Sequence, residues 1–185
     1  PFGSGIDLPQ SQLRRDDPAL AGFDPEELGH IDALVHAAIT DSAFPGAQVA
    51  IVKDGLLVYN KSFGAQTYDA GAREIDAGTI FDLASLTKVI ATTAAAMKLV
   101  DQKKLALDEP VGRYIPAFAR GEKSAITLRH LLLHRGGRPP FRQLWKFCPD
   151  PLSAIDSVYA TPLVAAPGDT TIYSDLGMIV LGKVV

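Results

Sequence analysis

The stretch FDLASLTK, residues 81–88, leads into the most apolar segment of the chain. From about Ser85 to Lys103 the sequence is rich in alanine and other strong helix formers, with few polar interruptions. A helix that is apolar on most of its sides belongs in a protein core. The stretch therefore predicts a buried helix whose first turn carries a serine and a lysine, Ser85 and Lys88.

The spacing of Ser85 and Lys88 suits nucleophilic catalysis. Three residues apart, both side chains lie on one face of a helix and within hydrogen-bond reach. A serine hydroxyl attacks a carbonyl only when a base takes its proton, and a desolvated lysine can be that base. The helix N-terminus adds N–H groups where an oxyanion would form. The alternative is a serine that caps a helix beside a lysine that reaches solvent.

A second candidate group lies far downstream, in Tyr173-Ser174-Asp175. A tyrosine hydroxyl beside a lysine ammonium can shuttle a proton to a leaving group. Asp175 can pair with Lys88 and hold it in place. By spacing alone neither motif is specific, and a tyrosine stacked under a loop is an equal interpretation.

Upstream, the sequence predicts a helix followed by a hairpin. Asp24 is a good N-cap, Pro25 suits the first helical position, and an apolar stripe follows, so we expect a helix over 25–41. Two β-rich runs, 48–53 and 56–63, are joined by Asp-Gly, a strong hairpin signal. Residues 1–22 show no periodicity, and we expect regular structure to begin at Asp24.

The remainder of the chain is predicted to be helical. A two-stranded hairpin is marginal alone, so these strands are interpreted as the first half of a sheet whose remainder is absent. Short helices are expected over 111–114, 128–134, 151–160 and 176–185. The predicted organisation is an extended lead-in over 1–23, an N-terminal helix and β-hairpin of a mixed α/β domain over 24–80, and a helical domain over 81–185.

Composition narrows the range of functions. The chain has 185 residues, 47% hydrophobic and 21% charged, which is typical of a globular protein. A net charge of −3 argues against nucleic acid as a partner. Cys148 is the only cysteine, which excludes an internal disulfide. No apolar stretch approaches the roughly 20 residues that a membrane helix needs, so we expect no membrane span.

Three segments of the chain, taken together, resemble the serine β-lactamase-related superfamily. The most similar branch is the class C type, with its DD-peptidase and family VIII esterase relatives. The resemblance runs in order from about residue 25 to the end and implies an α/β (α+β) fold of the β-lactamase/transpeptidase type, with a helical domain inserted after the first strands. The segments are Phe81 to Lys88, Leu131-Leu132-Leu133-His134-Arg135-Gly136-Gly137, and Pro167-Gly168 followed by Tyr173-Ser174-Asp175-Leu176-Gly177.

The resemblance implies a role for each candidate residue. Ser85 would be the acylated nucleophile and one oxyanion donor through its backbone N–H, Lys88 its base partner, and Tyr173 the proton relay. Asp175 departs from the asparagine more usual in the class C branch. A carboxylate there raises the pKa of Lys88, so the proton relay would depend more on Tyr173.

The third motif of the superfamily, a Lys/His-Thr/Ser-Gly type triplet on a later strand, is missing. Lys53-Asp54-Gly55 and His134-Arg135-Gly136 match it loosely, but the first is the predicted hairpin turn and the second a helix exit, so we interpret both as structural. Either the chain is an N-terminal portion whose C-terminal strands are missing, or it is a degenerate homologue. The former is favoured, and its partner would be the remaining C-terminal portion of the same protein.

These observations predict a serine hydrolase that acts through an acyl-enzyme. Its substrate would be a small molecule or peptide with a reactive ester, amide or β-lactam carbonyl, and no metal or organic cofactor is implied. The alternatives are a non-catalytic penicillin-recognising or sensor homologue and a structural piece that needs a partner chain. The resemblance favours a periplasmic or secreted setting over the cytoplasm.

Other chemically capable residues have structural interpretations. His130 and His134 have a zinc-compatible spacing, but no third ligand is near in sequence and apolar residues lie between them. Cys148 lies beside Pro149 with no base signal, which argues against a catalytic thiol. A cationic and aromatic loop is interpreted as a solvated segment, with recognition of a substrate carboxylate as the alternative; it holds Arg135, Arg138, Arg142 and Lys146 around Phe141, Trp145 and Phe147.

Overall fold

The computed structural model describes residues 13–185, and the chain divides into two compact units. Unit 1 runs up to Phe81, and unit 2 runs from Asp82 to Val185. The boundary falls at the start of the FDLASLTK stretch, so all four candidate residues lie in unit 2. Each unit is described by itself.

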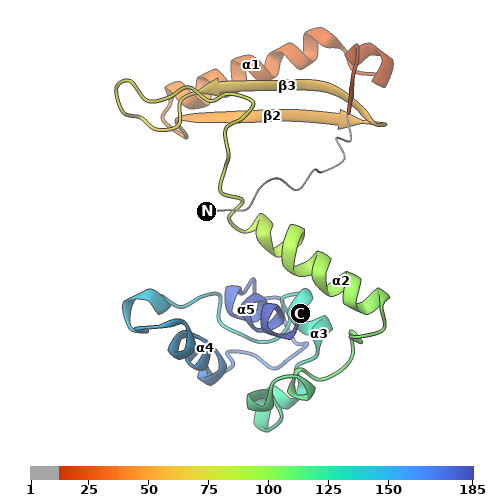
Figure 1. The fold of residues 1–185 in the computed structure, drawn as a ribbon, viewed down its shortest axis with the longest axis vertical. Coiled ribbons are helices and arrows are strands. Elements are labelled where there is room, and N and C mark those ends of the chain that lie inside the picture. Colours follow the sequence, from red (N-terminus) through yellow and green to blue (C-terminus); the bar gives the residue numbers. More distant parts are fainter. Residues whose placement is uncertain (1–12) are drawn as a thin grey trace, which may run out of the picture. The chain divides into compact units, whose positions relative to one another are not determined.

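Unit 1 is a helix packed on a small sheet. Helix α1 (Pro25–Thr40) is capped by Asp24, whose carboxylate accepts the N–H of Glu26 at 2.8 Å. Strands β2 (Gly46–Lys53) and β3 (Leu56–Gly64) pair antiparallel, and α1 covers one face of them (Figure 1). Both turn residues, Asp54 and Gly55, have positive φ, as a tight hairpin requires. The predicted helix and hairpin are confirmed.

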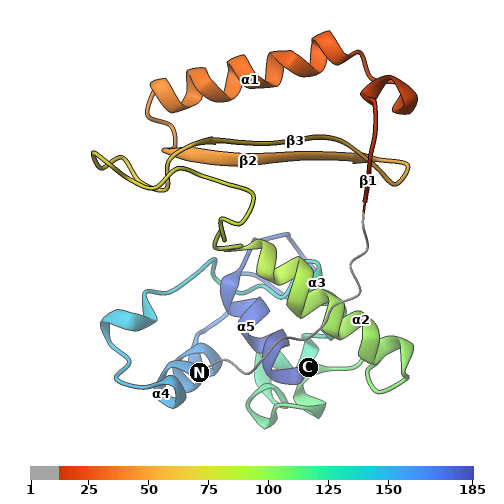
Figure 2. The same cartoon turned by 45° about the horizontal axis from the view of Figure 1, so that its top comes forward.

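The expectation that regular structure begins at Asp24 is wrong. Strand β1 (Arg14–Arg15) pairs parallel with β3, which gives a three-stranded sheet in the order β1-β3-β2 (Figure 2). A 3-10 helix, η1 (Pro18–Ala21), follows, with the Asp17 side chain accepting the N–H of Ala19. Elements of two and four residues are too short to show a hydrophobic period. The first twelve residues of the expected lead-in lie outside the described part.

The core of unit 1 is built where α1 meets β3. Leu28, Tyr59 and Phe63 are buried there. The Tyr59 hydroxyl donates to the Asp32 carboxylate of α1, and Lys61 Nζ reaches the same carboxylate at 2.5 Å. Burial, then the hydrogen bond to Asp32, raises the pKa of Tyr59 to about 12. These bonds fix the helix on the sheet.

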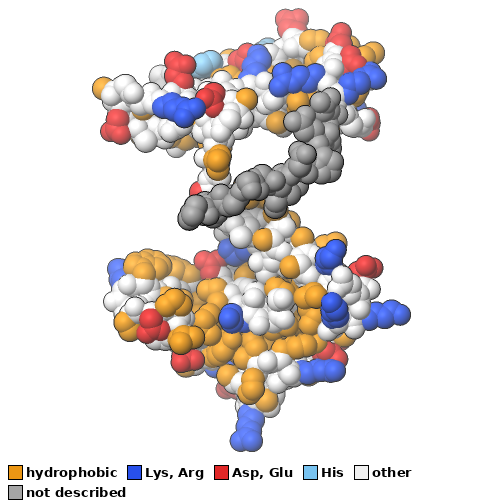
Figure 3. Space-filling model, in the orientation of Figure 1, with side chains coloured by type: hydrophobic (Ala, Val, Ile, Leu, Met, Phe, Trp, Pro, Cys, Tyr) orange, Lys and Arg blue, Asp and Glu red, His pale blue; other side chains and the backbone are white. Residues whose placement is uncertain are grey.

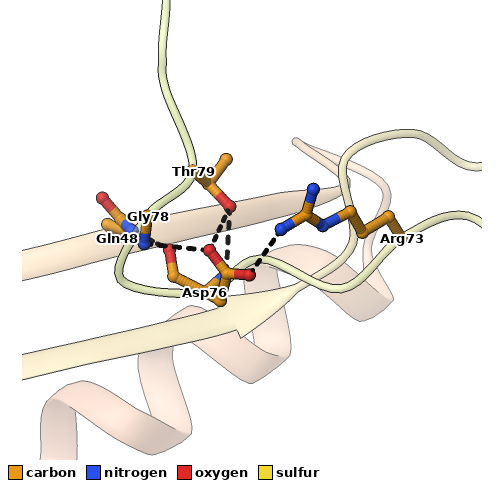
Figure 4. Close-up of polar contacts among 5 residues, drawn as sticks. All are labelled: Gln48, Arg73, Asp76, Gly78 and Thr79. Atoms are coloured by element: carbon orange, nitrogen blue, oxygen red, sulfur yellow. Dashed lines mark hydrogen bonds and ion pairs between the residues drawn. The ribbon is translucent and has the colours of Figure 1, made fainter.

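The connection that leaves the sheet is closed by Asp76 (Figure 4). Its carboxylate accepts the N–H of Gly78 at 2.9 Å and pairs with Arg73 at 2.8 Å, while the Asp76 N–H donates to Thr79 at 3.0 Å. The Gln48 amide, from β2, donates to the Asp76 carbonyl. Hydrogen bonding, to Arg73 first, lowers the pKa of Asp76. An aspartate that binds its own following backbone is a compact turn, and Gln48 ties this turn to the sheet.

Unit 2 is helical, with loops punctuated by proline. Its core contains apolar side chains from most of these helices, including Phe118, Leu131, Val158, Leu176 and Leu181. The elements are η2 (Lys88–Thr93), α2 (Ala94–Asp101), η3 (Val111–Arg113), η4 (Pro116–Phe118), η5 (Gly121–Ala125), α3 (Leu128–Leu132), η6 (Leu144–Lys146), α4 (Pro151–Ala160) and α5 (Asp175–Val184).

The expectation of one buried helix over 85–103 is wrong in two respects. The segment begins with a turn and continues as a π-helix, η2, before the α-helical geometry of α2. Ala96 is buried, but Val89, Ile90 and Met97 are exposed. The apolar composition predicts burial on most sides, whereas within unit 2 one face of the segment packs on the core and the opposite face is not covered by the rest of that unit.

Helix α3 ends two residues earlier than predicted. Leu133 is its C-cap, and His134 takes a left-handed φ of +54°, so the chain turns before Gly136 and Gly137. The N–H of Arg135 then closes the end of the helix by donating to the carbonyl of His130 at 2.7 Å. The predicted helix exit at His134-Arg135-Gly136 is therefore confirmed, and so is the turn at Lys53-Asp54-Gly55.

Unit 2 also exposes apolar side chains on its surface. Figure 3 shows hydrophobic side chains gathered on the face of this unit that the view presents. Trp145, 71% exposed, and Phe147 belong to the segment just before α4. Within residues 13–185, no helix combines the length and the apolarity that crossing a membrane requires.

Candidate active site

Ser85 lies in a strained turn at the entrance to η2. The preceding residue, Ala84, has a φ of +42°, which is uncommon for a residue with a Cβ. The Asp82 carboxylate supports this turn by accepting the N–H of Ala84 at 2.8 Å, and the N–H of Thr87 donates to the Ala84 carbonyl at 3.1 Å. Strained backbone persists where its surroundings enforce it, and it concentrates at functional sites. The Ser85 side chain is thereby presented at an exposed position.

Lys88, the first residue of the π-helix, reaches two of the other candidates. Its Nζ lies 2.8 Å from Ser85 Oγ and 2.8 Å from Asp175 Oδ1. The same ammonium lies 5.2 Å from the centroid of the Tyr173 ring. Single turns of π-helix are rare in proteins, but those that occur are frequently found at functional sites. The structure therefore brings together all four residues that the sequence predicted, from segments about 85 residues apart.

Tyr173 and Asp175 are positioned by the start of α5. Between them, Ser174 is the N-cap, and its hydroxyl accepts the N–H of Gly177 at 3.1 Å. Ser174 is 3% exposed, while Tyr173 on one side is exposed and Asp175 is half-exposed. Because the cap is buried, its two neighbours are directed outward toward Lys88.

The two prolines after the Gly136-Gly137 turn hold the start of α5 from the other side. Ser174 Oγ donates to the carbonyl of Pro139 at 2.6 Å, and the N–H of Asp175 donates to the carbonyl of Pro140 at 2.7 Å. The sequence analysis did not predict the capping role of Ser174, because it considered only Tyr173 and Asp175 in this motif. Its spacing to Gly177, three residues on at a helix start, was the available signal.

The contacts within the cluster shift the pKa values of Lys88 and Tyr173 in opposite directions. The hydrogen bond to Asp175 raises the pKa of Lys88, and burial opposes that shift without reversing it. Interaction with Ser85 first, then with Lys88, lowers the pKa of the Tyr173 phenol. Lys88 is consequently a cation at neutral pH, and Tyr173 is the group whose proton is easier to remove.

An open cleft adjoins the ion pair. It has a volume of about 490 Å³ and is lined by residues of unit 2 that include Thr87, Lys88, Asp175, Met178 and Ile179. The cleft is partly apolar and has the Lys88–Asp175 pair on its wall. Its lining includes Lys88 and Asp175 but not Ser85 or Tyr173.

The other candidates have structural roles. His130 Nδ1 accepts the N–H of Thr127 at 3.3 Å in a capping box, and His134 Nδ1 accepts the N–H of Ser174 at 3.1 Å. Over residues 13–185, no cluster of three or more His, Cys, Asp or Glu side chains has the arrangement of a metal site. Cys148 is a half-buried free thiol.

The solvated interpretation of the cationic loop does not fit Arg138 and Arg142, whereas Lys146 is exposed. Arg138 is 1% exposed, and its guanidinium donates to the carbonyl of Val158 while Nε and one Nη remain without a partner among the described residues. Burial lowers its pKa to about 10. Arg142 donates to Ser157 and Thr161 at 2.9 and 3.0 Å. These two arginines bind the C-terminal turn of α4, where the helix dipole is negative.

Comparison with known proteins assigns the chain to a family. The family model described as "Beta-lactamase" matches residues 31–185, most of the chain. The chain belongs to the beta-lactamase family. The resemblance inferred from the three sequence segments is confirmed, and so is the α+β fold class.

Individual relatives agree with this assignment. A curated protein of Escherichia coli O157:H7 named "Putative D-alanyl-D-alanine carboxypeptidase" is 33% identical over 192 residues, and the match covers 94% of this chain. The octameric penicillin-binding protein homologue of Pyrococcus abyssi has a TM-score of 0.74 at 29% identity, over 85% of this chain and 38% of its own. A class C beta-lactamase, with a TM-score of 0.68 at 23% identity over 82% of this chain and 41% of its own, shares the fold. The chain spans 44% of the length of the curated relative.

Proposed function

We propose that this chain carries the nucleophilic half of a serine hydrolase that works through an acyl-enzyme. One observation carries the proposal: Lys88 Nζ lies 2.8 Å from both Ser85 Oγ and Asp175 Oδ1, beside the Tyr173 ring. A serine that merely capped a helix would not require this convergence of a cation, a carboxylate and a phenol. Membership of the beta-lactamase family supports the same interpretation.

In the proposed reaction, Ser85 Oγ attacks a carbonyl carbon. Tyr173, as a phenolate stabilised by the Lys88 ammonium, takes the serine proton and passes it to the leaving nitrogen or oxygen as the bond from the carbonyl carbon to that group breaks. The product is an ester of Ser85. Water then attacks this ester; Tyr173 takes a proton from the water and passes it to Ser85 Oγ as the ester bond breaks, which releases free Ser85 and a carboxylic acid.

Lys88 and Asp175 have electrostatic roles in this proposal. A charged Lys88 stabilises the tyrosinate and the developing negative charge on the serine oxygen. Asp175 fixes the position of the ammonium and keeps it protonated. The backbone N–H of Ser85 supplies one oxyanion donor, which is an expectation from the family resemblance.

The substrate proposed first is a peptide amide that ends in D-alanyl-D-alanine, because the curated relatives are named for a carboxypeptidase of that type. A β-lactam and a small ester are the alternatives for the same acylation chemistry. The test uses the full-length protein with a fluorophosphonate probe, a D-alanyl-D-alanine peptide, a chromogenic β-lactam and an activated ester. We expect stoichiometric labelling of Ser85, mapped by peptide mass spectrometry.

Three substitutions define the result. Ser85→Ala abolishes labelling, Tyr173→Phe slows it by roughly 10²-fold or more because the proton relay is lost, and Ser124→Ala, at an exposed serine of η5, leaves it unchanged. Absence of labelling in the full-length protein contradicts the proposal. Binding of a β-lactam without turnover or a covalent bond indicates instead the non-catalytic sensor, the second candidate function.

A further inference from the structure

His134 contacts Tyr173 through both its backbone and its ring. Its carbonyl accepts the N–H of Ile172 at 2.8 Å, and its Nδ1 accepts the N–H of Ser174 at 3.1 Å. The two imidazole and phenol rings lie 4.5 Å apart between centroids, at a tilt of 36°. The residues before and after Tyr173 and the Tyr173 ring are therefore all bound to a single residue of another segment.

The backbone of His134 is specialised for this contact. Its φ of +54° ends α3 and turns the chain toward Tyr173. Histidine, asparagine and aspartate are the residues with a Cβ that accept this conformation most readily. A left-handed, half-buried histidine that stacks on a candidate catalytic ring is a more specific arrangement than helix termination needs.

The hydrogen bond to Ser174 fixes the protonation state of the imidazole. A nitrogen that accepts an N–H has a free lone pair, so Nδ1 is unprotonated and the proton of the neutral ring is on Nε2. The charged and titratable groups that face the ring are Lys88 on η2, Asp175 on α5, and Tyr173. An imidazolium would lose the Ser174 bond and face the Lys88 ammonium.

We infer that His134 is a positioning residue for Tyr173. The neutral imidazole of His134 holds the phenol of Tyr173 where it meets Ser85 and Lys88. The inference rests on the proposed function in one respect, namely that Tyr173 is the proton relay. His134 itself transfers no proton in the reaction. It acts by fixing the backbone on both sides of the tyrosine and the plane of the tyrosine ring.

The contacts of His134 can be removed one at a time. His134→Asn retains an acceptor close to the place of Nδ1 and tolerates the left-handed backbone, but it loses the ring. His134→Phe retains a ring and loses the acceptor, and His134→Ala loses both. His30→Asn, at an exposed histidine of α1, is the matched control.

The first readout is independent of turnover. The ionisation of Tyr173 is followed in the full-length protein by ultraviolet difference absorbance against the Tyr173→Phe variant. We expect the pKa of Tyr173 to rise toward its ordinary value in His134→Ala, to rise less in His134→Asn, and to stay unchanged in His30→Asn. An unchanged titration in His134→Ala overturns the inference.

The second readout is the rate of Ser85 labelling. A misplaced reacting group costs up to about 10²-fold, so we expect His134→Ala to lower the maximal labelling rate by roughly 10- to 100-fold with little change in probe affinity. His134→Asn should recover part of this loss. In the unmodified protein we also expect the labelling rate to fall in acid, where protonated His134 loses its bond to Ser174, and His134→Asn should remove that fall. If all three variants label Ser85 at the rate of the unmodified protein, the inference is overturned.

A measurement on the unmodified protein covers the case in which the variants fail to fold. The ¹⁵N shifts of the His134 imidazole report which ring nitrogen carries the proton. We expect an unprotonated Nδ1 at neutral pH, and a protonated Nδ1 there contradicts the inference. If Ser85 is never labelled but the tyrosine titration responds to His134, the proposed function fails while the positioning role stands.

Discussion

At the scale of single residues, Asp175 decides how the proton is handled. Its carboxylate holds Lys88 at 2.8 Å and is the largest cause of the raised pKa of that lysine. Asp175→Asn removes the charge and keeps the size of the side chain, so the pKa of Lys88 falls and a larger fraction of Lys88 is neutral near pH 8. We expect the alkaline fall in the rate of Ser85 labelling to begin at lower pH than in the unmodified protein, because the Lys88 ammonium that stabilises the Tyr173 phenolate loses its charge sooner. The pH profile of labelling is the measurement.

The matched control is Asp156→Asn, an exposed aspartate of α4 outside the cluster. It should leave the pH profile in place. A labelling rate that instead rises in Asp175→Asn as Lys88 loses its charge would show that neutral Lys88 is the base, and it would contradict the proposed role of the charged ammonium.

At the scale of elements, the start of α5 couples the helix to the site. The Ser174 hydroxyl makes two hydrogen bonds: it accepts the N–H of Gly177 in a buried bond and donates to the carbonyl of Pro139 in a partly buried one. Ser174→Ala removes the cap and leaves the Pro139 carbonyl without its donor, so we expect a loss of about 2 kcal/mol in the free energy of unfolding. Urea denaturation measures this loss.

The comparison is Asp150→Ala, which removes the exposed N-cap of α4 and its bond to the N–H of Ser153. A loss of about 1 kcal/mol is typical of a helix cap alone. If Ser174→Ala costs no more than Asp150→Ala, the bond between Ser174 and Pro139 does not hold the site.

Prediction from sequence succeeded where local chemistry determines an element and failed where distant packing does. Asp24, Pro25 and the Asp54-Gly55 pair were sufficient for α1 and the hairpin, because caps and turns act within a few residues. The strand Arg14–Arg15 depends on pairing with the distant strand β3, and which face of α2 is buried depends on packing against distant segments of unit 2. Ser85 and Lys88 are neighbours on one helical turn, so their contact follows from local spacing. His134 and Ser174 are 40 residues apart, and neither segment alone contains a pattern that predicts their contact.

At the scale of the whole molecule, different groups limit stability at the two ends of the pH range. Asp32 and Asp76 in unit 1 and Asp108 in unit 2 have lowered pKa values, each caused first by a hydrogen bond to a basic side chain. Their contribution is present above the ordinary carboxyl pKa near 3.8 and is lost as pH falls through the lower folded values. Burial likewise lowers the pKa of His134, so its contribution begins to be lost below its ordinary value of 6.5. We expect the free energy of unfolding, from urea titrations, to fall in two stages on acidification.

At alkaline pH, Tyr59 and Lys88 limit the stability of the protein, because their pKa values are raised in the folded state. The Tyr59 contribution is complete below its ordinary pKa of 10.0 and is lost as pH rises toward about 12, because a buried phenolate would face the Asp32 carboxylate. Tyr59→Phe removes the ionisable group and the hydrogen bond together. We therefore expect this variant to be less stable than the unmodified protein at pH 8 and to lose less of its stability between pH 8 and pH 11. Equal losses in the two proteins over that interval would mean that Tyr59 ionises as freely in the folded chain as in the unfolded one, and that its bond to Asp32 does not hold α1 on the sheet.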